Sequence, residues 1–409
     1  MQQQHGYRLL AVAMVVAALA LIAASCSESD DGDDASQGPD VPSAEVAAER
    51  LADADLDFAP VDEQVDAYVA EHELNGAALV VVDEDLGVVH EHYTGDFAPD
   101  RPSLIASSSK MLTAGVLMRL HDQGMLDVDE PVAEVVDWGD ANPDITPAQL
   151  LSNSSGLVGL IQDPTFRPYL CQYLAVGTLG ECGEQIFTTA EDDDLVIPPD
   201  TEFRYGGGQW QVAGAVAEAA SGESWAELIE QTYVEPCGVD SLAYNNHFTQ
   251  VVGDDGPFSY PPQFDGDPSV LDDTDNPNME GGAYIDPLDY AELLLMHLRG
   301  GECEGGRVLS EESVDRMQTD RVVSTYDAAL GRGSGTERVG DYGGYGLGWW
   351  IGSQDPDYVE DGGAFGAVPW IDRDRGYGVY LVIESSNRLG RELAKQLRPD
   401  IETQMDRLD

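Results

Sequence analysis

A serine and a lysine at the expected start of a helix are the first residues in this chain with clear chemical potential. In the stretch "IASSSK", Ser107 and Lys110 are three residues apart, and residues at this spacing lie on one face of a helix. A serine hydroxyl is a poor nucleophile at neutral pH and needs a neighbouring base. Lysine can be that base if burial and the positive end of a helix lower its pKa. The spacing therefore predicts a nucleophilic Ser107 activated by Lys110.

The scarcity of lysine favours this interpretation. Of the 409 residues, 77 are acidic and 20 are lysine or arginine, and only Lys110 and Lys395 are lysines. Arginine could not take over the role of Lys110, because its pKa is too high for it to act as a base. The alternative is a serine that caps the helix and a lysine on the surface, which is the commoner origin of a lone Ser-x-x-Lys.

The formal net charge of −57 restricts the class of protein. A nucleic acid is excluded as a partner, because binding phosphates requires a basic face. Disorder is excluded too, since 42% of the residues are hydrophobic and can form a core. The acids are expected to form a solvated surface whose self-repulsion is screened by salt, which suggests a high-salt habitat.

Strand patterns lie near both ends of the chain and helix patterns lie in the middle. The fold class expected is α+β, with one antiparallel sheet formed by both chain ends, flanked by helices, and an inserted helical subdomain. The sheet region covers about 60–126 and 291–409, and the helical region about 127–290. The strands are predicted at 76–83, 87–95, 345–352, 367–372 and 376–385, and the helices at 109–124, 209–221, 224–234, 289–301 and 388–398, the last ending before Pro399.

The amino-terminal residues have the pattern of an export signal. Residues 9–24 are an unbroken apolar run, too short to span a bilayer comfortably, and small residues precede Cys26. This pattern resembles a bacterial lipoprotein signal, with residues 1–25 removed and Cys26 lipidated. An ordinary secretory signal is the alternative. Residues 26–45 are expected to be an acidic flexible tether, and residues 46–409 the folded domain of an exported, membrane-anchored lipoprotein.

Export permits disulfides, and four cysteines follow Cys26, which allows three pairings. We favour Cys171 with Cys182, because they flank a short loop that contains glycine, and this leaves Cys237 with Cys303. The histidines and acidic runs lack the spacing of a metal site, so no metal and no cofactor are expected.

The stretch "IASSSKMLTAGVLMRLHDQGMLDVDEPVAEVV" resembles the serine beta-lactamase-related family, which includes class C beta-lactamases, D-alanyl-D-alanine peptidases and esterases of the same fold. Four further blocks are similar to that family in the same order: "ITPAQLLSNSSGL", "FRYGGGQWQVAGAVAEAASGESWAELIEQTYVEPCGVDSL", "NPNMEGGAYIDPLDYAELLLMHLRGG" and "YGLGWWIG". The resemblance implies a beta-lactamase/penicillin-binding-protein-like fold. It also implies acyl transfer to Ser107, with Lys110 as proton-transfer partner and Tyr205 as second base or proton relay to the leaving atom. The backbone N–H groups of Ser107 and Ala364 would form the oxyanion hole.

The second motif of this family departs from its usual pattern here. Gly207 stands where the Tyr-x-Asn asparagine is expected, and Asn153 replaces a histidine in the preceding block. One interpretation is that Gln209 fills the space left by the asparagine, and the simpler alternative is a glycine required by a turn. Asn153 is expected to be structural.

The third motif also departs from the family pattern, which is a cation or histidine, then any one residue, then a glycine. Here the three positions hold Asp361, Gly362 and Gly363, so an acid stands where a cation or histidine is expected. Asp361 would repel a substrate carboxylate, as would the field of the whole protein. The residues therefore favour a serine hydrolase, an esterase or amidase, acting on a neutral small-molecule ester or amide. A D-alanyl-D-alanine carboxypeptidase or beta-lactamase is the first alternative, and a non-catalytic binding lipoprotein that keeps the fold is the second.

Overall fold

The computed structural model describes residues 44–408, apart from residues 161, 164, 255, 257, 323–341 and 354. The expected signal peptide, Cys26 and nearly all of the tether lie outside the described residues. Within the described part, no helix is long and apolar enough to cross a membrane. There, too, no three His, Cys, Asp or Glu side chains gather as metal ligands would.

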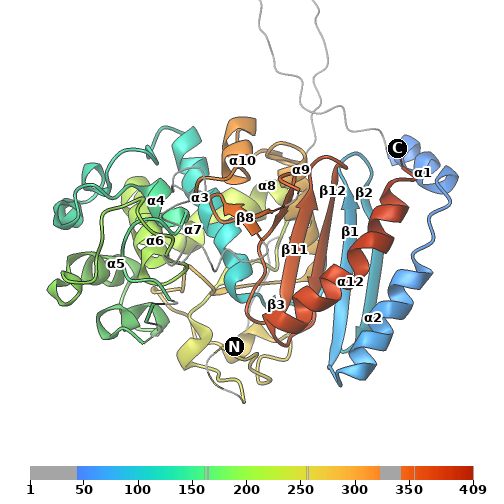
Figure 1. The fold of residues 1–409 in the computed structure, drawn as a ribbon, viewed down its shortest axis with the longest axis horizontal. Coiled ribbons are helices and arrows are strands. Elements are labelled where there is room, and N and C mark those ends of the chain that lie inside the picture. The colour runs from blue at the N-terminus through green and yellow to red at the C-terminus, as the bar shows by residue number, and fades with distance from the viewer. Residues whose placement is uncertain are drawn as a thin grey trace, which may run out of the picture. The chain divides into compact units, whose positions relative to one another are not determined.

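Strands from both ends of the chain join in one sheet, as the sequence predicted. The strand β1 pairs antiparallel with β12, so that residues 78–83 lie beside residues 377–382. Figure 1 shows this directly, with the blue strands of the amino-terminal part next to the red strands of the carboxyl-terminal part. The order in the sheet is β2 (Gly87–Gly95), β1 (Gly76–Asp83), β12 (Tyr377–Val382), β11 (Ala367–Asp372), β10 (Tyr358–Glu360), β9 (Trp350–Gly352) and β8 (Tyr342–Tyr345).

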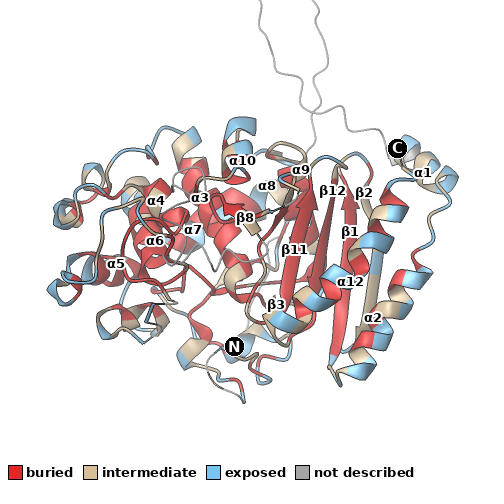
Figure 2. Ribbon diagram, in the orientation of Figure 1, coloured by how far each residue is buried: buried red, intermediate tan, exposed pale blue. Residues whose placement is uncertain are grey.

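Both faces of this sheet are covered, and β1 is accordingly buried along its whole length. Alternate side chains of a strand point to opposite faces. Leu79 and Val81 pack with the helices α2 (Ala59–Glu71) and α12 (Asn387–Met405), whereas Val80 and Val82 join the larger core on the other face. Figure 2 shows the central strands and the helix α3 (Lys110–Asp122) as the most buried elements.

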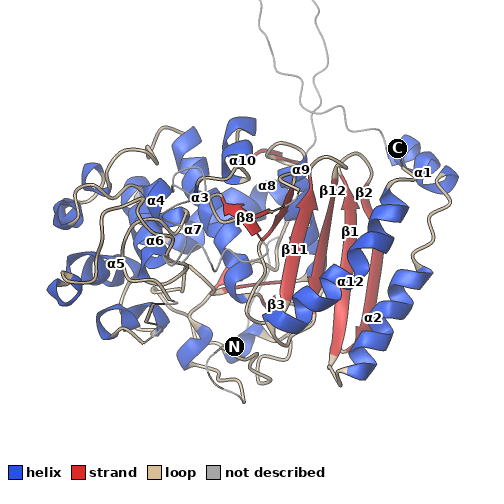
Figure 3. Cartoon of the chain, in the orientation of Figure 1, coloured by secondary structure: helices blue, strands red, loops and turns tan. Residues whose placement is uncertain are grey.

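Helices and short turns make up the middle of the chain, and Figure 3 shows them gathered on one side of the sheet. Several of these helices begin at a capping residue, for example Thr178 before α5 and Ser224 before α7, which satisfies backbone N–H groups in the first turn. The remaining helices are α1 (Ala44–Asp53), α4 (Pro147–Leu151), α5 (Leu179–Thr188), α6 (Gly208–Ser221), α7 (Trp225–Ile229), α8 (Glu235–Cys237), α9 (Pro287–Leu298) and α10 (Glu311–Met317).

Short elements complete the fold and set the position of the site. The strands β3 (Ser103–Leu104), β5 (Ala283–Ile285) and β4 (Ala243–Tyr244) form a small sheet, and β6 (Glu302–Cys303) pairs with β7 (Gly306–Arg307). The short 3₁₀ helices are η1 (Ala106–Ser109), η2 (Val132–Glu134), η3 (Asp137–Ala141), η4 (Arg167–Tyr173), η5 (Ala190–Asp192), η7 (His247–Thr249) and η8 (Pro268–Val270), and η6 (Glu230–Val234) is a π-helical turn.

Two expected elements differ from the structure. The strand expected at 345–352 is divided, because residues 346–349 form a turn that joins the end of β8 to β9, closed by the hydrogen bond from Gly346 N to Trp349 O. The helix α12 does not end before Pro399 but continues through it to Met405. A proline inside a helix costs about 3 kcal/mol. The residues Ile401 and Met405 beyond it are buried in the core that α12 forms with the sheet, and this apolar contact keeps the last turns helical.

Both expected disulfides are present. Cys171 is bonded to Cys182 and links η4 to α5, and Cys237 is bonded to Cys303 and links α8 to β6.

Candidate active site

Of the three consecutive serines, Ser107 is the one whose hydroxyl is not used to build the fold. Ser108 Oγ donates to the backbone oxygen of Asp361 at 2.5 Å and is fully buried. Ser109 Oγ donates to Ala106 O at 2.6 Å and accepts from Ala283 N at 3.0 Å. Ser107 precedes them in η1 and is half-buried. The fold therefore leaves this serine accessible at the start of α3.

Lys110 contacts Ser107 as the spacing predicted. Its Nζ lies 3.1 Å from Ser107 Oγ and donates to the backbone oxygen of Glu280 at 3.0 Å. The lysine side chain is fully buried. Its ammonium also lies over the rings of Tyr205, 4.7 Å from the centroid, and Trp210, at 5.6 Å. These contacts fix the lysine against the serine without exposing it to water.

The expectation that Lys110 has a lowered pKa is wrong. Burial does lower the pKa of this lysine, but the Tyr205 phenol and the carboxylates of Glu280 and Asp361 raise it, and the net pKa lies above the ordinary lysine value. The sequence argument counted burial and the helix start but did not include two acids that meet the lysine only in the folded chain. In the resting protein Lys110 is therefore an ammonium.

Tyr205 completes a compact group with Ser107 and Lys110. Its phenol interacts with both side chains, and its ring stacks on Trp350 with centroids 5.2 Å apart. Burial raises the pKa of Tyr205 although Lys110 opposes this, so the phenol is protonated at neutral pH. The structure thus brings together the three residues that the sequence singled out, with both neighbours of Ser107 in their protonated forms.

The loop that carries Tyr205 is fastened by buried polar side chains. Asn153 Oδ1 accepts from the backbone N–H of Gly206 at 2.9 Å and from Trp210 Nε1 at 2.9 Å. Gln209 Nε2 donates to the backbone oxygens of Arg204 and Gly206. Asn153 is structural, as expected. Gln209 serves this turn and does not take the place of the asparagine missing from the second motif.

Gly207 is required by the backbone. Its φ is +85°, and a Cβ at this position would lie 2.9 Å from the backbone nitrogen of Leu160. At Gly206, a Cβ would lie 2.6 Å from a carboxylate oxygen of Glu280. Gly206 therefore leaves room for that carboxylate, and the turn interpretation of Gly207 holds.

Glu280 is a site residue that the sequence reasoning missed. Its Oε2 lies 3.5 Å from Lys110 Nζ and accepts from Gly207 N at 2.8 Å, and its Oε1 accepts from the hydroxyl of Tyr173 at 3.1 Å. Its side chain is only 6% exposed. The sequence does contain a signal that could have identified it, because Glu280 is the single charged residue between Asn276 and Ile285. Charge of this kind in a buried segment needs a partner, and that partner is Lys110.

The third motif lies against the start of α3. A Cβ at Gly363 would come 2.0 Å from the backbone oxygen of Ile105, so only glycine allows this close approach. The next residue, Ala364, is half-buried and its backbone N–H has no acceptor among the described residues. This leaves the N–H available for an oxyanion. Gly362, by contrast, contacts the side chain of Asn387 rather than η1.

Asp361 does not have the position that the sequence suggested. It is fully buried, and its Oδ2 accepts from the backbone N–H of Met111 at 3.1 Å in the first turn of α3. Burial raises the pKa of Asp361 well above its usual value, although Lys110 opposes this. The expectation that Asp361 repels a substrate carboxylate is wrong, because its side chain is committed to the helix start and presents no charge to solvent.

Comparison with known proteins agrees with this geometry. The sequence pattern of the Beta-lactamase family matches residues 61–400. The chain belongs to the beta-lactamase family. As a member of this family of serine hydrolases, it is 27% identical over 352 residues to penicillin-binding protein 4 of Amycolatopsis lactamdurans, which covers 80% of this chain and 85% of that protein.

Solved structures share this beta-lactamase-family fold. EstCE1, a hydrolase with promiscuous acyltransferase activity, is 18% identical with a TM-score of 0.64, covering 87% of this chain and 99% of that one. A variant of simvastatin synthase from Aspergillus terreus is 19% identical with a TM-score of 0.64, covering 85% and 97%. At these identities the likeness shows the fold alone.

Proposed function

We propose that this beta-lactamase-family protein is an esterase or amidase that hydrolyses neutral substrates through an acyl-enzyme on Ser107. The observation that carries the proposal is the 3.1 Å contact between Ser107 Oγ and the fully buried Lys110 Nζ. Ser107 is therefore an accessible hydroxyl beside a proton-transfer group. The N–H of Ala364, which follows the Gly363 that lies close to Ile105, has no acceptor within the described part of the chain.

The protonation states indicate how Ser107 is activated. Lys110 is an ammonium, so it can accept the serine proton only if it gives one of its own to another group. The carboxylate of Glu280, 3.5 Å from Nζ, is in position to take that proton. In the first step the bond from Oγ to the acyl carbon forms, the Oγ proton passes to Lys110, and a lysine proton passes to Glu280.

The electron pair of the substrate carbonyl moves to its oxygen, which the N–H groups of Ser107 and Ala364 hold. When the tetrahedral species collapses, the bond to the leaving atom breaks. Tyr205 gives that atom its proton, and the proton held by Glu280 returns through Lys110 to the phenolic oxygen. Water then repeats the sequence on the ester of Ser107, which releases the acid and restores the resting site.

A preference for neutral substrates rests on the charges of the site. The third motif carries Asp361 where the resemblance led us to expect a cation, and that side chain is buried. The ammonium of Lys110 already faces the carboxylate of Glu280 at 3.5 Å. The third motif therefore offers no cation to a substrate carboxylate, and the ammonium of Lys110 is already paired with Glu280.

The test is hydrolysis of p-nitrophenyl acetate and butyrate by the purified full-length chain, at low and high NaCl, beside Ser107→Ala. Hydrolysis that is lost in the variant supports the proposal. Equal hydrolysis by both proteins, or none by a folded wild type at any salt concentration, would overturn it.

A D,D-peptidase or another penicillin-recognising protein is the second candidate, and the similarity to penicillin-binding protein 4 over 80% of the chain favours it. Fluorescent penicillin and a fluorophosphonate separate the candidates. Labelling by the fluorophosphonate alone indicates an esterase, labelling by both indicates a penicillin-recognising enzyme, and labelling by neither indicates a binding protein.

We also propose that the enzyme works in the cell envelope, held to a membrane by a lipid on Cys26. The support is the apolar run that ends in small residues directly before this cysteine, followed by an acidic segment. Incorporation of a labelled fatty acid that Cys26→Ser abolishes would support the anchor. Recovery of unmodified wild-type protein from the medium would show an ordinary secretory signal instead.

A further inference from the structure

Three aromatic side chains from separate segments meet next to the proposed catalytic group. Tyr173 ends η4, Phe248 lies in η7, and Phe258 lies in the loop that follows. The ring centroid of Tyr173 lies 5.2 Å from that of Phe248 and 6.3 Å from that of Phe258. The ring centroids of Phe248 and Phe258 are 6.2 Å apart. All three contacts are edge-on. We call these three residues the apolar wall.

The apolar wall is connected to the nucleophile by two routes. The hydroxyl of Tyr173 donates to Glu280, whose other oxygen faces Lys110 and so adjoins Ser107.

On the other route, Phe248 stacks on His247 at 4.1 Å, and His247 contacts the ring of Phe365 at 5.5 Å. Phe365 directly follows Ala364, whose N–H is the expected oxyanion donor. Contacts therefore connect the wall to both the lysine side and the oxyanion side of the site.

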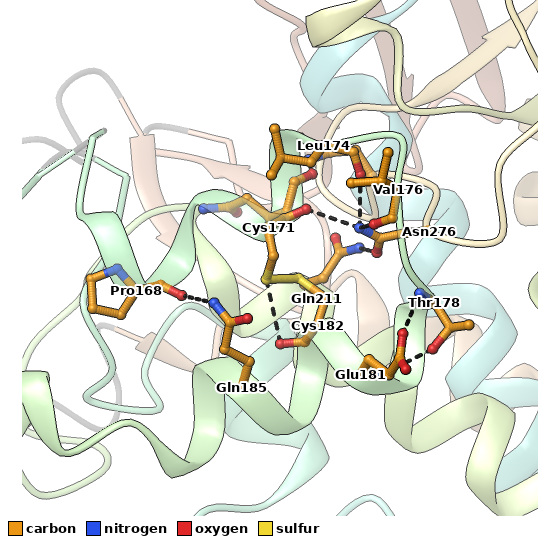
Figure 4. Close-up of a disulfide and its surroundings, with 12 residues drawn as sticks. Pro168, Cys171, Leu174, Val176, Thr178, Glu181, Cys182, Gln185, Gln211 and Asn276 are labelled. Carbon is orange, nitrogen blue, oxygen red and sulfur yellow. Dashed lines mark hydrogen bonds between the residues drawn. A yellow bond between two sulfur atoms is a disulfide. The ribbon is translucent and has the colours of Figure 1, made fainter.

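The backbone behind the wall is held by several buried polar contacts. Asn276 Nδ2 donates to Cys171 O and to Leu174 O, both at 2.9 Å. Asn246 and Asn278, each fully buried, donate to Gln172 O at 2.9 and 2.8 Å. Figure 4 shows Asn276 reaching this segment beside the disulfide between Cys171 and Cys182.

Polar side chains and a disulfide thus fix a segment whose own side chains are left facing outward. In this segment Leu174 is 40% exposed and Val176 is 70% exposed, and in the apolar wall itself Phe258 is 43% exposed. Exposed apolar groups beside a reactive centre are typical of a substrate site. A rigid backing also reduces the entropy lost when a ligand binds.

We propose that the apolar wall binds the acyl group of the substrate, so that the enzyme acts on esters or amides of apolar carboxylic acids. This inference rests on the proposed function, because it assigns a chemical class to the substrate of the same site. The wall joins the site through Glu280 and Lys110, whereas the leaving group is served by Tyr205, whose ring packs instead against Trp350. The acyl group is therefore the part of the substrate that meets the wall.

The experiment measures kcat/KM of the full-length enzyme for p-nitrophenyl acetate, butyrate and hexanoate. A methylene that leaves water on binding is worth at most about fourfold in kcat/KM. We expect a rise of at least about tenfold from acetate to hexanoate. Phe258→Ala should reduce the ratio of hexanoate to acetate by about threefold or more. Met125→Ala is the matched control, because Met125 is 54% exposed and makes none of the wall's ring contacts.

A second series keeps the acetyl group and lengthens the alcohol. If kcat/KM follows the alcohol and not the acyl group, the wall binds the leaving group and the assignment is overturned. A hydrolysis that depends on Ser107 but is indifferent to acyl length also overturns it, while the proposed function stands. Absence of any Ser107-dependent hydrolysis overturns both.

Discussion

Replacing Glu280 by glutamine tests the arrangement on which the proposed mechanism depends. Glutamine has the same shape, and its carbonyl oxygen can still accept from the N–H of Gly207 as the carboxylate does now at 2.8 Å. The change removes a negative charge 3.5 Å from the buried ammonium of Lys110. At an effective dielectric constant of 20, that charge pair is worth about 5 kcal/mol.

Two results should follow. The variant has no carboxylate to receive the proton from Lys110, so kcat/KM for p-nitrophenyl butyrate should fall by about 10²–10⁴-fold at pH 7. The free energy of unfolding should fall by about 3–5 kcal/mol, because an uncompensated ammonium is left buried.

The pH dependence has a defined sign. The folded pKa of Lys110 is raised, so its contribution to stability is complete below the ordinary lysine pKa and is lost as the pH rises through the folded value. The stability difference between wild type and variant should therefore be largest at neutral pH and shrink above about pH 10.5. In the variant the pKa of Lys110 is lower, so the remaining activity should increase with pH as neutral lysine becomes the base.

The assays are urea denaturation at several pH values and initial rates from pH 6 to 10 on protein shown to be folded. Glu392→Gln is the matched control, because Glu392 is 55% exposed and pairs with Arg388 on the surface of α12. It should change neither quantity appreciably. A Glu280→Gln protein with wild-type kcat/KM and an unchanged pH profile would refute the proton route.

Three further outcomes are expected. Asp361→Asn should raise the unfolding free energy by about 1 kcal/mol or more at pH 7 and leave it unchanged near pH 3. The reason is that the pKa of this buried carboxyl is raised in the folded protein, so the wild type loses stability as the pH rises above the pKa of Asp361 in the unfolded chain. Equal effects of the substitution at both pH values in urea denaturation would contradict this. Cys237→Ser with Cys303→Ser opens a loop of 66 residues and should cost about 4 kcal/mol, as measured by denaturation beside the wild type with both disulfides intact, and an unchanged unfolding free energy would contradict this. The melting temperature should rise with NaCl because of the net charge of −57, and a temperature that stays constant between low and high salt would contradict that reasoning.

The global arrangement was predictable because it depends on patterns local in sequence. The apolar composition of β1 and of the helix that begins at Lys110 predicts that both are buried. The strand patterns at both ends of the chain predict that these strands share one sheet. The contact between Ser107 and Lys110 was predictable for the same reason, because it depends on spacing along one helix.

The electrostatics of the site could not be predicted, because they arise from residues far apart in sequence. Glu280 is 170 positions from Lys110, and nothing in its sequence neighbourhood shows that Gly206 leaves space for its carboxylate. From its place in a motif, Asp361 was expected to face the substrate and repel a carboxylate. In the structure its side chain is instead oriented by the hydrogen bond from the N–H of Met111. Motif position locates a backbone, but the direction of a side chain depends on its partners.

The most direct test of the central claim is to react the full-length protein with a fluorophosphonate and identify the modified residue by mass spectrometry of its peptides. The structure predicts one adduct, on Ser107, because the hydroxyls of Ser108 and Ser109 are buried and hydrogen-bonded. The adduct should be absent from Ser107→Ala and should form more slowly in Glu280→Gln. An adduct on another residue, or none on a folded protein, would contradict the assignment of Ser107 as the nucleophile.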